Sequence, residues 1–418
     1  MSIKAYELKK AAASPIVIGL ILVFIAFNIF VICSNTYYND DLKVLNKIVD
    51  KFGYEINDSM LNNFQMYYED ELKKVNEITY AKTAKTYSSA GELLQDHSSY
   101  ELYSKEQQSF FKRTGVVENY YNIAKNIDES YKAINITDMG KDGVTSYRLS
   151  GQAAETVRKQ YNKLAVRFEQ LKDNGEHKNL FFIGKAYRMH KFLFGTLFRS
   201  FIIEIGILVV LITGYLLSYE FENRTQLMAY STKRGRKLDR DKLFTAIFLS
   251  IGITTIILGL SLAVYFAVFD YSGLWRVPIG SGFNWEYGLP YISWWKMSLV
   301  QYMICCIVLV YLCEIIFTFI AYSISCFIRN SYMVCFIFTV LGGLAFVIPS
   351  LMPSYSNAIF AAQFTPFVLC GYCMEWFMEK GAMAPFKYYE LITVMVWSII
   401  VIILYSICNG RFKKQNIY

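Results

Sequence analysis

YEFENRTQLMAYSTKRGRKLDRDKL, residues 219–243, is the most polar stretch between two long apolar runs of this chain. The runs on either side, residues 198–218 and 243–269, are each long enough to cross a bilayer, because about 20 apolar residues in a helix span the ~30 Å hydrocarbon core. The stretch between them is therefore predicted to be a loop held at a membrane surface by both ends. It is rich in Lys and Arg, and short loops of this kind stay on the cytoplasmic side of a membrane.

Four further apolar runs lie before and after this pair, at residues 15–34, 297–327, 332–351 and 391–408. The second to sixth of the six runs all fall within residues 197–409. Alternation across the membrane places residues 1–14, the turn at 328–331 and the tail at 410–418 on the side of the loop, and all of these segments are basic. We therefore expect an all-α polytopic protein of the cell membrane, with six transmembrane helices and both termini in the cytoplasm. Residues 1–14 are expected either to lie as a helix in the membrane interface or to act as a simple positive anchor.

Residues 35–196 form one long polar segment, which the same alternation places outside the cell. Apolar residues recur at helical spacing in three stretches of it, 42–52, 60–77 and 152–173, and no proline occurs between Pro15 and Pro278. We therefore predict a mainly helical extracellular domain. Because the two ends of this domain leave adjacent spans, its first and last helices are expected to pair as an antiparallel stalk.

The composition separates the two parts of the chain. Of the 418 residues, 54% are hydrophobic, which is too many for a soluble protein, and 18% are charged, which is too many for a protein embedded throughout. Residues 36–195 hold 23 Lys and Arg against 22 Asp and Glu, so nearly all of the net charge of +8 lies in the membrane part. The basicity therefore reports orientation and contact with the lipid bilayer, and no nucleic-acid partner is expected.

The cysteines and histidines do not form a recognisable site. None of the nine cysteines lies in residues 36–195, which excludes a disulfide-held domain there. Cys370 and Cys373 form a CxxC pair without a second pair or a nearby His, so no metal site is expected, while a local disulfide is an open alternative. The three histidines, His97, His177 and His190, are scattered along the chain and are interpreted as ordinary surface residues.

The chain also lacks the short motifs that mark nucleotide or catalytic sites. GxxxxGK[ST], HExxH and GxSxG are all absent, which argues against a P-loop, a membrane metalloprotease and an α/β-hydrolase. We therefore expect a protein that is not an enzyme, with no catalytic residue and no cofactor of its own. If it works as a pump, the energy must enter from another subunit.

The loop at 219–243 carries a pattern that is more specific than its charge. An acidic opening is followed by Thr225, a short apolar turn, the run Ser-Thr-Lys-Arg-Gly-Arg, and a lysine at the mouth of the next span. This pattern resembles the cytoplasmic loop of ABC exporter permeases of the type-two class, the class that handles drugs, polysaccharides, ions and bacteriocins. Arg224 stands where that family usually has Gly. The resemblance covers the loop closely and the six-span layout loosely, and it does not extend to the external domain.

The resemblance implies the permease subunit of an ATP-driven exporter, which moves a peptide, antibiotic, lipid or similar substrate outward. In that family two permeases, identical or paralogous, work with two ABC ATPase subunits, and ATP and Mg bind to the ATPase. The loop would seat in a cleft of the ATPase with its short apolar turn as the central contact. The residues expected to take part in this coupling are Glu220, Glu222, Thr225, Leu227, Met228, Tyr230, Ser231, Lys233, Arg234, Arg236 and Lys242.

Two carboxylates lie inside predicted spans. Glu314 falls in the middle of the fourth run, and Glu204 lies nearer the end of the second. A charged side chain at the centre of a membrane helix costs roughly 2.5–3.5 kcal/mol on insertion scales, so Glu314 should face a partner or a water-filled cavity. Both residues are candidates for a translocation path, and the alternative for Glu314 is a hydrogen bond between helices.

Other functions are also open at this point. A basic loop considered without this pattern is more simply interpreted as a solvated positive-inside loop. A membrane sensor or scaffold would use the external helical domain to bind a ligand or a partner protein, although the sequence shows no attached kinase or other output domain. An integral membrane enzyme would need a catalytic set that the sequence does not show. A neighbouring gene for an ATPase would favour the exporter, and a neighbouring histidine kinase gene would favour the sensor.

Overall fold

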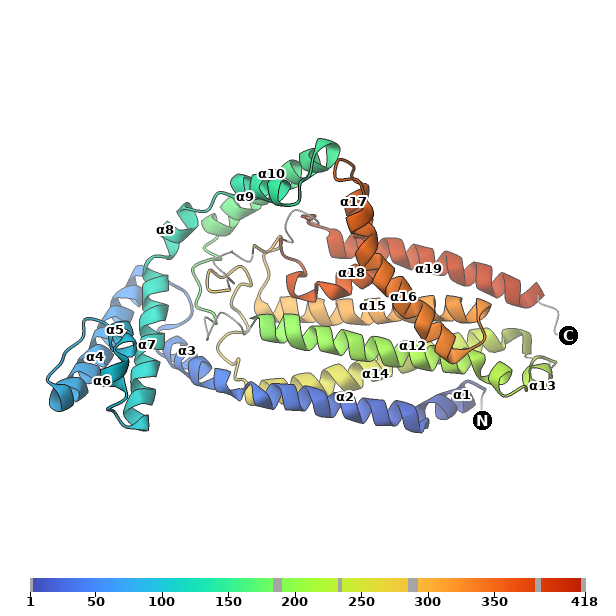
Figure 1. Ribbon diagram of the computed structural model, residues 1–418, viewed down its shortest axis with the longest axis horizontal. Helices are drawn as coiled ribbons and strands as arrows, with labels where there is room; N and C mark the ends of the chain where they lie inside the picture. The colour runs from blue at the N-terminus through green and yellow to red at the C-terminus, as the bar shows by residue number, and fades with distance from the viewer. Residues whose placement is uncertain (1–2, 183–189, 232–234, 285–291, 380–384, 415–418) are drawn as a thin grey trace.

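A computed structural model describes residues 3–182, 190–231, 235–284, 292–379 and 385–414 (Figure 1). Helices dominate these ranges, in which no β-strand occurs and extended segments meet only in isolated antiparallel bridges. Six of the described helices are long and apolar enough to cross a membrane. The predicted fold class, an all-α polytopic membrane protein with six spans, is confirmed.

The spans pack around one central helix, α12. It lies against four of the other five spans, and 72% of the most apolar part of its span is buried, compared with 17% for the spans of α2, α16 and α19. Helices α2, α16 and α19 therefore lie at the rim of the bundle and turn apolar side chains outward, as helices in contact with lipid do. The six helices are α2 (Pro15–Ser34), α12 (Phe198–Glu222), α14 (Leu238–Val268), α15 (Leu299–Phe327), α16 (Ser331–Leu351) and α19 (Tyr389–Lys414).

The polar helices gather at one end of the spans, whereas α1 (Ile3–Ala12) and α13 (Gln226–Tyr230) lie at the other end (Figure 1). We call these ends the domain side and the loop side. The domain side holds eight helices of residues 39–173, in the chain order α3 (Asn39–Phe52), α4 (Asp58–Thr83), α5 (Ala90–Gln95), α6 (His97–Tyr100), α7 (Lys105–Lys125), α8 (Ile127–Lys132), α9 (Ile136–Ser146) and α10 (Gly151–Asp173).

The three domain stretches with helical spacing are helices, because they lie inside α3, α4 and α10. Local capping sets where several of the domain helices begin. The Asn57 side chain accepts from the backbone N–H of Met60 at the start of α4, and Ser104 and Gln107 form a capping box at the start of α7. Residues 84–150 contain the five helices α5 to α9, of which α7 is the longest at 21 residues.

The predicted stalk of the first and last domain helices is wrong. Helix α3 packs against α7, and α10 packs along α9 instead. The apolar face of α10 is already covered there: Gly140 of α9 leaves so little room that an added Cβ would lie 2.7 Å from the Tyr161 ring, and Leu171 lies against Gly280 of the membrane half. Figure 1 shows α10 and α3 on separate arms of the domain.

The segments that join the spans on the domain side are compact rather than extended. Residues 352–379 contain α17 (Ala358–Ala361), α18 (Pro366–Gly371) and the short 3₁₀ turn η4 (Cys373–Glu375). Helix α18 lies among α12, α15, α16 and α19. Backbone bonds from Trp294 to Phe377 (3.1 Å) and from Glu379 to Ile292 (2.8 Å) tie this segment to the one before α15.

The domain and the spans share one hydrophobic core. A continuous cluster of buried side chains runs from Leu45 and Phe168 in the domain to Phe201 and Val310 in the spans. A second, smaller cluster around Phe111 holds the far tip of the domain together. Because the main cluster crosses the boundary, the domain is not a separate module on a linker.

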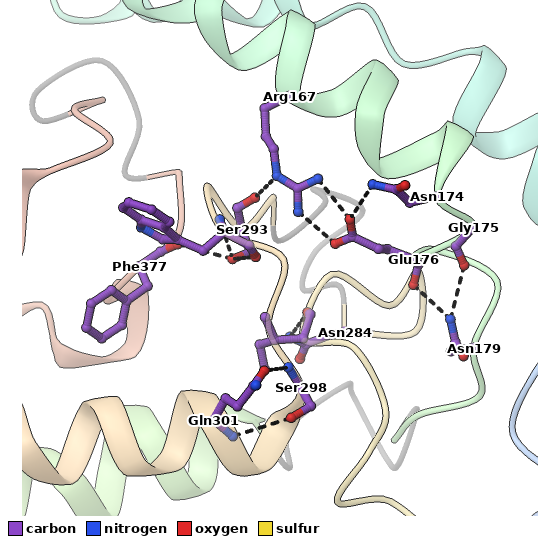
Figure 2. A network of polar contacts seen from close by, with 12 residues as sticks. Arg167, Asn174, Gly175, Glu176, Asn179, Asn284, Ser293, Ser298, Gln301 and Phe377 are labelled. Carbon is purple, nitrogen blue, oxygen red and sulfur yellow. Dashed lines mark hydrogen bonds and ion pairs between the residues drawn. The ribbon is translucent and has the colours of Figure 1, made fainter.

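A buried ion pair fastens this boundary (Figure 2). Arg167 of α10 binds Glu176 in a two-point arrangement, with Nη1–Oε1 at 2.9 Å and Nη2–Oε2 at 2.7 Å, and its Nε donates to the Ser293 carbonyl at 3.1 Å. Arg167 and Glu176 are only 7% and 2% exposed. The guanidinium therefore links the domain to the segment that precedes α15.

Candidate functional site

The predicted loop is shorter than its sequence suggests. Helix α12 continues through Glu222 and α14 begins at Leu238, so that only residues 223–237 lie between the two long helices. This remainder includes the short helix α13 and the 3₁₀ turn η3 (Gly235–Lys237). Glu220 and Glu222 consequently belong to the last turn of a span, and Lys242 belongs to the first turns of the next one.

A left-handed turn at Arg224 sets the direction of α13. Arg224 has φ +58°, its N–H donates to the Phe221 carbonyl at 3.2 Å, and the Thr225 N–H donates to the Glu220 carbonyl at 2.8 Å. These two bonds are those of a Schellman motif, in which the left-handed position favours glycine. The loop therefore takes a glycine-type turn although the residue at that position is Arg.

The apolar residues of α13 divide into an exposed pair and a buried anchor. Leu227 and Met228 are 57% and 76% exposed. Tyr230 is buried, and its ring lies 5.8 Å from that of Phe221 and 5.2 Å from that of Phe412. Two of the three residues predicted to make the apolar contact thus face outward, while Tyr230 fastens the end of α13 to the spans.

Tyr230 belongs to a cluster that also contains Asp239 and Arg329. The Tyr230 hydroxyl donates to Asp239 Oδ1 at 3.4 Å, and Arg329 Nη2 lies 3.5 Å from Asp239 Oδ2. The guanidinium also stacks over the Phe221 ring at 4.8 Å. Burial and the nearby Asp239 charge raise the pKa of Tyr230, so the phenol keeps its proton. This Tyr230–Asp239–Arg329 cluster joins α13 to α14, to the turn before α16 and, through Phe412, to α19.

A second cluster lies at the base of the loop around Glu220 and Lys242. Lys242, which is 0% exposed, forms an ion pair with Glu220, and its Nζ donates to the Leu216 carbonyl at 2.5 Å. Lys10 of α1 lies 3.6 Å from Glu220 and 2.6 Å from Glu7. Two acidic and two basic side chains balance one another here, as buried charges require.

Glu222 makes a third connection on the loop side. Its Oε1 accepts from both the backbone N–H and the hydroxyl of Ser331, each at 2.7 Å, so that the end of α12 is tied to the start of α16. Asn330 caps the same helix by accepting from the Met333 N–H at 3.0 Å. Tyr230 thus connects α13 to α12, α14 and α19, and Glu222 connects α12 in turn to α16.

The remaining predicted residues have different positions. Thr225 and Ser231 are exposed at the two ends of α13, and the Ser231 hydroxyl donates to the Met228 carbonyl at 3.1 Å. Lys233, Arg234 and the side chain of Arg236 lie outside the described residues. Sequence reasoning missed Glu7, Lys10, Asp239 and Arg329 as partners. The one available signal was the presence of charged residues directly beside apolar runs.

The two intramembrane carboxylates do not form one site. Glu204 Oε2 accepts from Asn28 Nδ2 at 2.7 Å, which links α12 to α2. Glu314 is 0% exposed, neither of its carboxyl oxygens has a hydrogen-bond partner among the described residues, and a Cβ at Gly206 would lie 3.9 Å from both oxygens. Positions 204 and 206 lie on nearly opposite faces of α12, because each residue turns a helix by about 100°.

Two of the three histidines are not surface residues, contrary to the expectation. His177 and His190 are 2% and 5% exposed, and only His97 is exposed. His177 Nε2 lies 3.0 Å from Asp128. Cys370 and Cys373 are both buried free thiols, and Cys373 Sγ donates to the Phe194 carbonyl at 3.1 Å. Within the described residues, no group of three His, Cys, Asp or Glu side chains is arranged to hold a metal ion.

Comparisons of this chain with protein-family models, with curated proteins and with solved structures found no match. The functional interpretation therefore depends on the arrangement of the loop side and on the resemblance of the loop sequence.

Proposed function

We propose that this chain is the permease subunit of an ATP-driven ABC exporter, and that the exposed pair Leu227–Met228 is where an ATPase subunit docks. The observation that carries the proposal is this pair on a short helix whose base is tied to the spans. A large apolar side chain that is 76% exposed, as Met228 is, gains free energy when a partner covers it. Aromatic and Met side chains are enriched at such contacts.

The contacts behind α13 give a route for movement. When a partner displaces α13, Tyr230 moves with it, and Asp239 and Arg329 are pulled in the same direction by contacts that are buried and charged. Glu222 transfers the displacement of the end of α12 to Ser331. Packed contacts of this kind shift between discrete arrangements instead of deforming gradually. The loop can thereby drive α12, α14, α16 and α19 together.

The other parts of the proposal follow from this one. ATP and Mg would bind to the ATPase, this chain would supply the path for the substrate, and a second permease would complete the working unit. The loop side would face the cytoplasm and the helical domain would be extracellular. Glu314 would take part in the path as a buried carboxyl without a hydrogen-bond partner, facing Gly206.

The decisive experiment is purification of the tagged chain from its own membranes, a test for a co-purified ABC ATPase, and a measurement of ATP hydrolysis by the complex. Met228→Asp and Leu227→Asp should each weaken the complex by roughly 10-fold or more, as the loss of a central apolar contact does. Met66→Asp is the matched control, since Met66 is also exposed, at 58%, but lies in the helical domain. Equal ATPase retention by all three variants would refute docking at this pair.

One observation favours a membrane sensor or scaffold as the second candidate. The shared core and the Arg167–Glu176 pair connect the helical domain directly to the spans. A ligand that changes the conformation of the domain would therefore also change the position of α15. The same co-purification separates the two candidates. An exporter subunit retains an ATPase, whereas a sensor retains none and changes its protease sensitivity on the loop side when the domain binds its ligand.

A further inference from the structure

Two grooves meet on the domain side where α10 crosses the start of α19. One has a volume of about 450 Å³ and the other of about 370 Å³, and both are lined by Phe386 and Ile392. They therefore adjoin and form one elongated depression. Each volume lies in the range that small-molecule sites occupy.

The larger groove is basic and polar. Lys163, Arg167 and Lys387 line it together with Gln160 and Gln170, and none of its lining residues is acidic. Arg167 is neutralised by Glu176, but Lys163 is exposed on α10 and makes no ion pair with any described residue. Lys387 lies 4.5 Å above the Trp295 ring. The groove thus presents two lysine charges to whatever enters it.

The two lysine ammonium groups are donors suited to an anionic, oxygen-rich group. Trp294 also lines this groove, but its side chain is only 3% exposed and its indole Nε1 is closed off from the groove, so it supplies no donor there.

The smaller groove is apolar and continues toward the bilayer. Phe360, Phe364 and Val396 line it. Val396 lies seven residues after the start of α19 at Tyr389, which is about 10 Å deeper along the span at the rise of an α-helix. Lys387, Trp295 and Tyr388 lie at the end of the double groove that is farther from the middle of the spans, and residues of these types mark the headgroup level of a membrane.

From this arrangement we propose that the double groove binds an anionic phospholipid of the leaflet on the domain side. The phosphate lies in the larger groove, within reach of Lys163 and Lys387. One acyl chain follows Phe364 and Val396 in the smaller groove. The proposal goes beyond the transport function and does not depend on it.

The grooved surface differs from the other basic depression of the molecule. A groove of about 510 Å³ along α3 holds Lys43, Lys47 and Lys51, but Asp50 and Asp270 line it as well. Lys43 therefore provides a matched control for general attraction of anions to lysine.

The test is native mass spectrometry of the full chain in neutral detergent, titrated with phosphatidylglycerol or phosphatidylcholine of identical acyl chains. Phosphatidylglycerol should bind more tightly, and the double variant Lys163→Gln/Lys387→Gln should lower its affinity by about 25-fold, at about 5-fold for each lysine near a membrane surface. Lys43→Gln should leave it unchanged.

Several outcomes would overturn the proposal. Equal binding of the two lipids to the unmodified chain would exclude recognition of the anionic headgroup. An undiminished preference in the double variant would exclude this groove. Competition by glycerol phosphate at the same concentration as the lipid would show a site for free phosphates, without a role for the apolar groove. Val396→Trp should block lipid and leave the weak binding of glycerol phosphate unchanged.

Discussion

The ion pair of Arg167 and Glu176 allows a quantitative test of how the domain is fastened to the spans. In the variant Arg167→Met, the Glu176 carboxylate loses both guanidinium bonds and keeps only a 3.4 Å contact with Asn174. Glu176 is 2% exposed, so it stays in a site that water does not reach. Removal of one partner of a buried pair costs roughly 3–5 kcal/mol, and the lost bond to the Ser293 carbonyl adds about 1 kcal/mol.

The reverse variant should be milder. In Glu176→Leu the guanidinium loses its partner, but Arg167 lines the basic groove beside α19 and can turn its charged end toward solvent. We expect the cost to be smaller by about 1 kcal/mol or more. The double variant Arg167→Met/Glu176→Leu removes both charges and fills the space with apolar atoms, so its stability should lie within about 1–2 kcal/mol of the unmodified chain.

The assay is equilibrium unfolding in detergent for the four chains of this double-mutant cycle. Amide hydrogen exchange reports the position of the effect, which should be greatest at the end of α10 and in residues 279–284. Lys159→Gln serves as the control, because Lys159 lies on the same helix in an exposed pair with Glu155. The reasoning would be refuted if Arg167→Met cost less than about 1 kcal/mol, or if the double variant were as unstable as the two single variants combined.

Two further predictions concern the loop and the domain. Arg224→Gly should raise the free energy of unfolding by about 1 kcal/mol, because a non-glycine residue at φ +58° is strained; an unchanged or lower melting temperature would contradict the left-handed turn. Burial lowers the pKa of His177 despite its bond to Asp128, so below about pH 6.5 the unfolded chain binds a proton that the folded chain does not. Stability should therefore fall as pH decreases from 7 to 5, by at most about 1.4 kcal/mol per pH unit for this group. His177→Gln should reduce this dependence, whereas replacement of the exposed His97 should not; equal pH dependence in all three chains would exclude His177 as its source.

The spans and the principal domain helices were predictable because each depends on a local pattern. A run of about 20 apolar residues has few structural alternatives to a membrane helix, and the spacing in 152–173 is enough to give α10 one apolar face. The stalk prediction failed because periodicity shows that a helix has an apolar face and does not show what covers it. For α10 the cover is α9 and the segment around Gly280.

The position of the loop between the second and third spans was predictable, but its internal arrangement was not. The sequence identified residues 219–243 as the loop, and Leu227 and Met228 are exposed there as expected. The same reasoning treated Tyr230, Glu220 and Lys242 as surface residues of that loop, although all three are buried. Their partners, Lys10 and Asp239 among them, come from segments that only the fold brings together.

Hydropathy and charge thus established the number of spans, the helical nature of the domain and the place of the loop, because these depend on how each segment interacts with water or lipid. The tertiary structure decided which loop side chains point inward, which helix faces meet, and where two grooves join beside α19. Those properties depend on contacts between residues as far apart as Lys10 and Glu220, or Arg167 and Ser293. A charged side chain near a membrane surface is stable either in water or beside a buried opposite charge, and only the three-dimensional arrangement shows whether that opposite charge is present.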